Sequence, residues 1–114
     1  MTQPVPDVTE RDVERVLQRD FPGEHAIKAR ELIQPSAYSN RPRVILAFLK
    51  VSAGDLERLK KLFEDDWRDV ICAAEYPQAT ALGWHQLDQC SASERQRIFD
   101  SDWQQYTEWL SRTA

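Results

Sequence analysis

Apolar residues recur at the three- and four-residue spacing of amphipathic helices through most of this chain. The first such segment begins at Thr9, a favourable N-cap, with Asp12 three positions later in an acidic variant of the capping box. It ends at Phe21-Pro22-Gly23, because proline disfavours helix in the residue before it. We therefore predict a helix between Thr9 and this break. Its apolar stripe consists of Val13, Val16 and Leu17.

Two further helices are predicted next, and the second of them is apolar on nearly every side. One runs from about Glu24 to Ile33, before a loop of turn-forming residues at 34–40. The other spans roughly Pro42 to Ala53, since proline suits a first helical turn. Its apolar run from Val44 to Leu49 also permits a strand, but its Leu, Ala and Lys residues and Gly54 as a C′ residue favour a helix. A helix that is apolar all round is usually central, so we expect this one to form the core.

The fourth predicted helix is the longest, from Asp55 as N-cap to about Glu75, where Tyr76-Pro77 ends it. Residues 77–89 give little pattern beyond one turn of helix around Ala79 to Leu82. A last helix begins at Ser91, with Glu94 completing a capping box, and a second box at Ser101 leaves open whether it is one helix or two. The apolar stripe of the fourth helix consists of Leu56, Leu59, Phe63, Trp67, Val70, Ile71 and Ala74.

These segments predict an all-α protein, a compact bundle or short stack of about five helices. The 114 residues fit a single domain over residues 9–114, preceded by a flexible lead-in over residues 1–8 that carries Pro4 and Pro6. An apolar fraction of 41% is enough for one core, since the four tryptophans each bury a large area.

Charge and cysteine content narrow the environment and the partners. The net charge of −4 makes nucleic acid an unfavourable partner, and no apolar run approaches a membrane span. The charge is uneven: residues 1–61 carry 11 basic and 9 acidic residues, whereas residues 62–114 carry 4 and 10. The N-terminus does not have the pattern of a secretory signal, so we expect a cytoplasmic protein in which Cys72 and Cys90 are free thiols.

Several short segments resemble a group of small, uncharacterised helical proteins from bacteria. The resemblance would cover roughly residues 41–110, and it implies a bacterial, cytoplasmic, helical protein without assigning any activity, cofactor or catalytic residue. The segments are Arg43 to Lys50 (RVILAFLK), Gly54 to Leu56 (GDL), Asp66 to Val70 (DWRDV), Ala73 to Pro77 (AAEYP) and Asp102 to Tyr106 (DWQQY).

The candidates for chemistry are few. The acidic cluster Glu64, Asp65, Asp66 and Asp69 indicates a solvated face, because it does not have the loop pattern that a Ca²⁺ site requires. Asp66 falls at the margin of the predicted apolar stripe, where a carboxylate needs a partner, so we predict a structural ion pair with Arg41 or Arg43 and favour Arg43. No metal site or cofactor is predicted. The four residues with the right ligand types for zinc lack its spacing: His25, Cys72, His85 and Cys90.

The aromatic residues of the last third provide the main hint of function. Aromatic side chains at helical spacing usually belong to a core, but Trp and Tyr are also enriched at protein interfaces. We predict an interaction surface there and favour a non-enzymatic interaction module, such as a regulator, an adaptor or a toxin-neutralising protein. Its partner would be another protein or a second copy of the chain. The candidate surface residues are Trp84, Trp103, Tyr106 and Trp109.

Two alternatives remain open at this point. A small enzyme that uses carboxylates and a histidine would bring together His85, Asp66, Glu75 and Asp88 in one pocket. A weak nucleic-acid binder would instead use the arginines of the N-terminal half, namely Arg11, Arg15, Arg19, Arg41 and Arg43.

Overall fold

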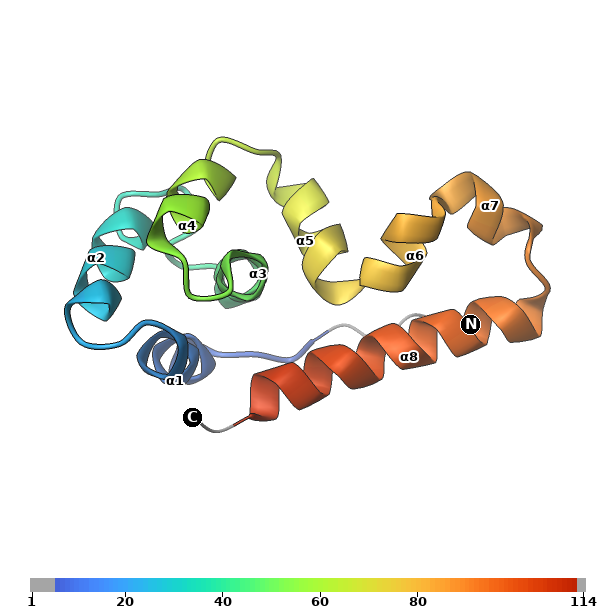
Figure 1. Ribbon diagram of the computed structural model, residues 1–114, viewed down its shortest axis with the longest axis horizontal. Helices are drawn as coiled ribbons and strands as arrows, with labels where there is room; N and C mark the ends of the chain where they lie inside the picture. Colours follow the sequence, from blue (N-terminus) through green and yellow to red (C-terminus); the bar gives the residue numbers. More distant parts are fainter. Residues whose placement is uncertain (1–5, 113–114) are drawn as a thin grey trace.

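The computed structural model describes residues 6–112, which form eight α-helices and no strand (Figure 1). The all-α class is confirmed, although the number of helices is larger than the five predicted. The helices are α1 (Glu10–Asp20), α2 (Glu24–Ile33), α3 (Pro42–Ser52), α4 (Leu56–Leu62), α5 (Trp67–Glu75), α6 (Pro77–Leu82), α7 (Trp84–Gln89) and α8 (Ala92–Ser111).

The first three helices match their predicted positions closely. The backbone amide of Thr9 donates to the carboxylate of Asp12 at 3.0 Å, as a capping box requires. Helix α3 is the centre of the molecule, and every residue from Val44 to Leu49 is buried. Figure 1 shows α3 end-on, with α1, α4 and α5 around it. The all-round apolar pattern of this segment therefore does mark the core helix.

The predicted fourth helix is in fact two. Helix α4 ends at Leu62, a turn follows, and α5 begins at Trp67 with Asp66 as its N-cap. The carboxylate of Asp66 accepts a hydrogen bond from the Arg68 amide at 2.9 Å, which satisfies one free amide of the first turn. The break lets both α4 and α5 pack against α3, which a straight helix of this length would not do.

The segment that gave little sequence pattern forms two short helices, α6 and α7, of six residues each. Helix α8 is a single helix of 20 residues, so the second capping box does not split it. Ser91 caps it by accepting from the Glu94 amide at 3.2 Å. In Figure 1, α8 runs along the lower edge of the molecule from beneath α7 to the neighbourhood of α1.

The molecule is elongated, with extents of 47 × 28 × 21 Å. Its radius of gyration of 14.8 Å exceeds the roughly 13 Å expected for a compact domain of this length. The main core lies among α1 to α5, and α6, α7 and the first half of α8 extend from it as an arm. Of the lead-in predicted over residues 1–8, residues 1–5 lie outside the described residues. Pro6 is buried, and Val8 packs against the core.

Candidate interaction surface

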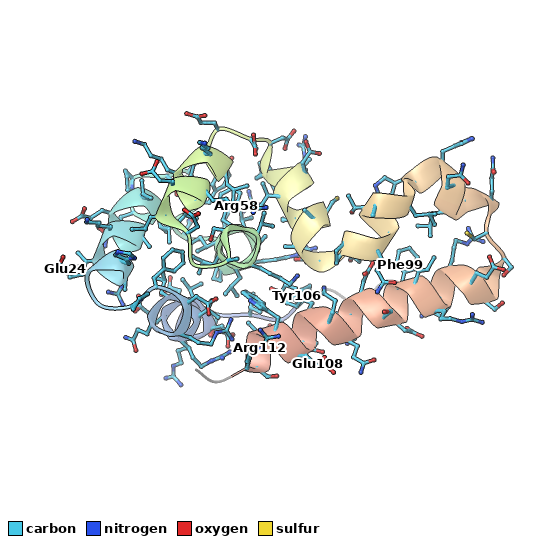
Figure 2. All side chains as sticks on the ribbon, viewed as in Figure 1. Glu24, Arg58, Phe99, Tyr106, Glu108 and Arg112 are labelled. Carbon is cyan, nitrogen blue, oxygen red and sulfur yellow. The ribbon has the colours of Figure 1, made fainter. Side chains whose placement is uncertain are left out.

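The four aromatic residues predicted to form one surface occupy three different environments. Tyr106 points from α8 into the interior, where only 1% of it is exposed (Figure 2). Its hydroxyl finds no hydrogen-bond partner among residues 6–112. Burial, together with the nearby Glu75 carboxylate, raises the pKa of Tyr106 far above its usual value. Tyr106 therefore belongs to the core and cannot contact a partner.

Trp109 is half-buried and so lies closer to the surface than Tyr106. Its ring packs against Tyr106 at a centroid distance of 5.6 Å, and the guanidinium of Arg19 lies 5.1 Å from its centroid. The same guanidinium donates to the backbone oxygens of Trp109 at 2.7 Å and Arg112 at 2.8 Å, so it caps the end of α8. A buried arginine thus holds Trp109 in place.

The remaining two residues belong to an aromatic surface on the arm, which we define as Tyr76, Trp84, Phe99 and Trp103. The Tyr76 ring meets Trp84 at 6.4 Å and Phe99 at 6.2 Å, both edge to face. Phe99 and Trp103 border, with Tyr76, a cavity of about 10 Å³. Trp84 is 45% exposed, and Leu82 beside it is 41% exposed.

Phe99 was not among the aromatic residues predicted to lie at this surface, whereas Tyr76 belongs to the same aromatic group of the sequence as Trp84 and Trp103. Tyr76 is also the residue before Pro77, where the fourth helix was expected to end. Phe99 falls at the apolar spacing of the last predicted helix, where a side chain usually belongs to the core. Both are half-buried, because α6 and α7 form an arm too thin to cover them.

The arm is held by polar groups of α8 that bond to the junction between α5 and α6. Asp102, which is fully buried, accepts from the backbone amides of Gln78 at 3.0 Å and Ala79 at 3.1 Å. The side chain of Gln105 donates to the Ala74 carbonyl at 3.3 Å. These bonds satisfy two amides at the start of α6 and one carbonyl at the end of α5, and they fix the backbone beneath the aromatic surface.

The predicted ion pair has a different partner. Arg43 donates to both carboxylate oxygens of Glu75, at 2.8 and 2.7 Å, and Glu75 is only 3% exposed. This contact raises the pKa of Arg43. Asp66 is exposed and caps α5 instead, because the break before α5 moves it away from the stripe on which the prediction relied. The pair with Glu75 joins the end of α5 to the start of α3.

The residues named for the enzyme alternative do not converge. Glu75 is fully engaged by Arg43, Asp66 caps α5, and the exposed ring of His85 contacts Gln89 on its own helix. Asp88 is exposed on α7. No group of three or more potential metal ligands occurs within residues 6–112. Cys72 and Cys90 are both free, and burial raises the pKa of the Cys72 thiol, which disfavours the reactive thiolate.

Several arginines of the nucleic-acid alternative are occupied by protein groups. Arg19 bonds to Asp20 and to the end of α8, and Arg15 bonds to Asp12 on its own helix. Arg41 lies 4.6 Å from the centroid of Trp67, over the ring. Arg43 is held by Glu75, and Arg11 is exposed on α1. They therefore do not form the continuous basic face that binding to phosphates requires.

None of the helices within residues 6–112 combines the length and hydropathy needed to cross a membrane. Comparisons of the chain with protein-family models, with curated proteins and with solved structures gave no match.

Proposed function

We propose that this chain is a non-enzymatic interaction module that binds another protein through the aromatic surface of its arm. The observation that carries the proposal is the exposure of Trp84, whose large apolar ring meets Tyr76, which in turn meets Phe99 and borders one small cavity with Trp103. Exposed apolar residues that occur singly are ordinary, whereas a contiguous group marks a site of contact. A regulator, an adaptor or a toxin-neutralising protein would each use such a surface, in a bacterial cytoplasm where both cysteines stay reduced.

Tryptophan and tyrosine are the residues that most often dominate the free energy of binding at interfaces. Trp84 gains the most from being covered, because nearly half of it is in contact with water. The Tyr76 ring packs edge to face against Trp84, and Phe99, which also contacts Tyr76, extends the surface onto α8. Since the bonds of Asp102 and Gln105 already fix the backbone there, binding would cost little ordering of the arm.

The shape of the surface favours a partner other than a second copy. An isologous dimer needs a surface that is complementary to itself, so an exposed tryptophan requires a recess in the same patch. The cavity beside the aromatic surface has a volume of only about 10 Å³, which is too small for an indole ring. A partner protein that supplies an apolar recess for Trp84 satisfies the geometry better.

The test compares two exposed apolar residues on opposite parts of the molecule. Trp84→Ala removes the proposed anchor, whereas Ile27→Ala removes a residue of α2 that is 55% exposed and lies outside the arm. Each tagged full-length protein is used to isolate complexes, and each candidate partner is then purified and titrated against all three proteins. We expect a partner whose Kd rises by about tenfold or more for Trp84→Ala and stays unchanged for Ile27→Ala.

The proposal fails if no purified partner distinguishes the two variants. Sedimentation of the wild type over a wide concentration range tests the second copy as partner. If the wild type forms a dimer and Trp84→Ala abolishes it, the partner is a second copy of this chain and the proposal of a different partner protein is wrong.

A further inference from the structure

A second region of the molecule, away from the arm, has the features of a binding site for a small anion. A cleft of about 570 Å³ lies between the end of α1, the end of α3 and the second half of α8. A volume of this size suits a small ligand. The charged and aromatic residues that line it are Arg19, Asp20, Lys50, Glu108, Trp109 and Arg112.

The charges of Arg19 and Asp20 neutralise each other, and the paired side chains form one side of the cleft. Arg19 donates to both carboxylate oxygens of Asp20, at 2.8 and 3.1 Å, while its remaining contacts are to the end of α8. The side chain of Arg19 is only 6% exposed. Asp20 therefore brings no free negative charge to the cleft, and Trp109 beside it is fixed by the same guanidinium.

Glu108 is the other carboxylate of the lining, and it is turned outward. Figure 2 shows it on the side of α8 that faces away from the interior, near Arg112 at the end of the helix. One of its oxygens accepts from the amide of Gln104 at 3.2 Å, one turn earlier on the exposed face. Glu108 lowers the positive potential at the rim of the cleft without occupying its floor.

Lys50 is one of two cations of this cleft for which no ion pair occurs among residues 6–112, and Arg112 is the other. Lys50 is half-buried, and no carboxylate of residues 6–112 lies within 4 Å of its ammonium group. Burial lowers the pKa of Lys50, the negative charge of Asp102 opposes this effect, and the positive charge of Arg112 adds a smaller lowering. Lys50 of α3 and Arg112, the residue after the end of α8, thus line the same cleft and repel each other.

We propose that this cleft binds a small oxyanion, a phosphate or carboxylate group, between Lys50 and Arg112 with the Trp109 ring as its wall. A bound anion converts the repulsion between the two cations into two charge-assisted hydrogen bonds, which are among the stronger contacts that a protein makes. It also gives the half-buried ammonium of Lys50 a counter-ion that residues 6–112 do not place within 4 Å of it. This site is independent of the aromatic surface on the arm.

The experiment is an NMR titration of the full-length protein with inorganic phosphate and, separately, with succinate at matched ionic strength. The signals to follow are the Trp109 indole N–H and the Lys50 ε-methylene, with the Trp67 indole as an internal reference. We expect saturable shifts of the Trp109 and Lys50 signals with at least one of the two anions and a rise in the pKa of Lys50. The anion that saturates identifies the ligand class.

Three variants provide the controls. Lys50→Met and Arg112→Gln each remove one cation, and we expect each to weaken binding by about tenfold, as the loss of one charge-assisted hydrogen bond predicts. Lys28→Met removes an exposed lysine of α2 and should leave binding unchanged. Because Arg112 is exposed, Arg112→Gln should fold normally and can still test anion binding if Lys50→Met disturbs the fold. Shifts that grow linearly with both anions, or that persist in both cation variants, would overturn the proposal.

Discussion

The carboxylate of Asp102 accepts a hydrogen bond from the backbone amide of Ala79, 23 residues earlier in the chain, so that a side chain of α8 caps the start of α6. Its other oxygen accepts from the amide of Gln78. Because Pro77 occupies the first position of α6 and has no amide hydrogen, Asp102 satisfies the next two donors of that turn. The position of the arm therefore depends on one buried carboxylate.

Replacement of Asp102 by alanine should leave both amides buried without an acceptor. We expect Asp102→Ala to lower the free energy of unfolding by about 2 to 3 kcal/mol, and Asp102→Asn by less, because an amide oxygen can still accept one bond. Urea denaturation measures the loss. Asp100→Ala, at an exposed position of the same helix, is the control. Its free energy of unfolding should stay within about 0.5 kcal/mol of the wild-type value.

Loss of Arg43 should be more harmful than loss of the whole ion pair. Arg43→Met leaves the Glu75 carboxylate buried without a counter-ion, and we expect it to cost about 2 to 4 kcal/mol of unfolding free energy. The double variant Arg43→Met, Glu75→Leu should recover much of this loss in thermal or urea unfolding. A double variant that is as unstable as the single one would contradict a purely electrostatic cause. Arg30→Met, which breaks an exposed pair with Glu14, should cost under about 1 kcal/mol.

Tyr106 should make the protein sensitive to alkaline pH. Its folded-state pKa is raised, so the folded protein holds the phenolic proton more tightly than the unfolded chain does. Its contribution to stability is complete below the unfolded pKa of about 10 and is lost as the pH rises beyond that value. Tyr106→Phe should therefore flatten the fall in Tm that the wild type shows at alkaline pH, which thermal unfolding at a series of pH values measures. At neutral pH the same variant should change stability by less than about 1 kcal/mol, because the hydroxyl has no partner within residues 6–112 to lose.

Gly54 allows α1 to approach the end of α3. Its φ is +83°, and a Cβ atom there would lie 2.8 Å from the backbone oxygen of Asp20. We expect Gly54→Ala to lower the free energy of unfolding by about 2 kcal/mol or more, from backbone strain and the clash together. Gly23 also has a positive φ, of +54°, but has open space around it. Gly23→Ala should lower the free energy of unfolding by about 1 kcal/mol, from backbone strain alone. If calorimetry gives equal losses of stability for the two variants, the close approach of Gly54 to Asp20 does not matter for stability.

The positions of the first three helices could be predicted because local signals decide them. Helix ends are set by residues close to them in sequence, here Thr9 with Asp12, Pro22, Pro42 and Gly54. The apolar run around Leu46 is stable only when it is buried in the core. The one long helix predicted from Asp55 to Glu75 was wrong for the opposite reason. Its apolar spacing fits a continuous helix as well as two, and the choice between them depends on what packs against each half.

The candidate surface was predictable only in part. Trp84 lies at the surface as the prediction requires, but Trp109 is covered by Arg19 from α1, and Tyr106 is enclosed by helices distant in sequence. No periodicity within α8 reveals what another helix places above it. The ion-pair partner of Arg43 could not be predicted from the sequence either. Glu75 lies 32 residues away in the chain, and the two residues meet only because α3 and α5 pack side by side.

The sequence by itself determined that this protein is helical, where its first helices begin and end, and which of them is central, because capping groups, prolines and apolar periodicity act over one or two turns. Only the tertiary structure decided which aromatic rings face water, which carboxylate meets which cation, and which lysine lines a cleft. Those properties are set by contacts between residues far apart in the chain, and the free energy of such contacts depends on burial, which no local pattern specifies.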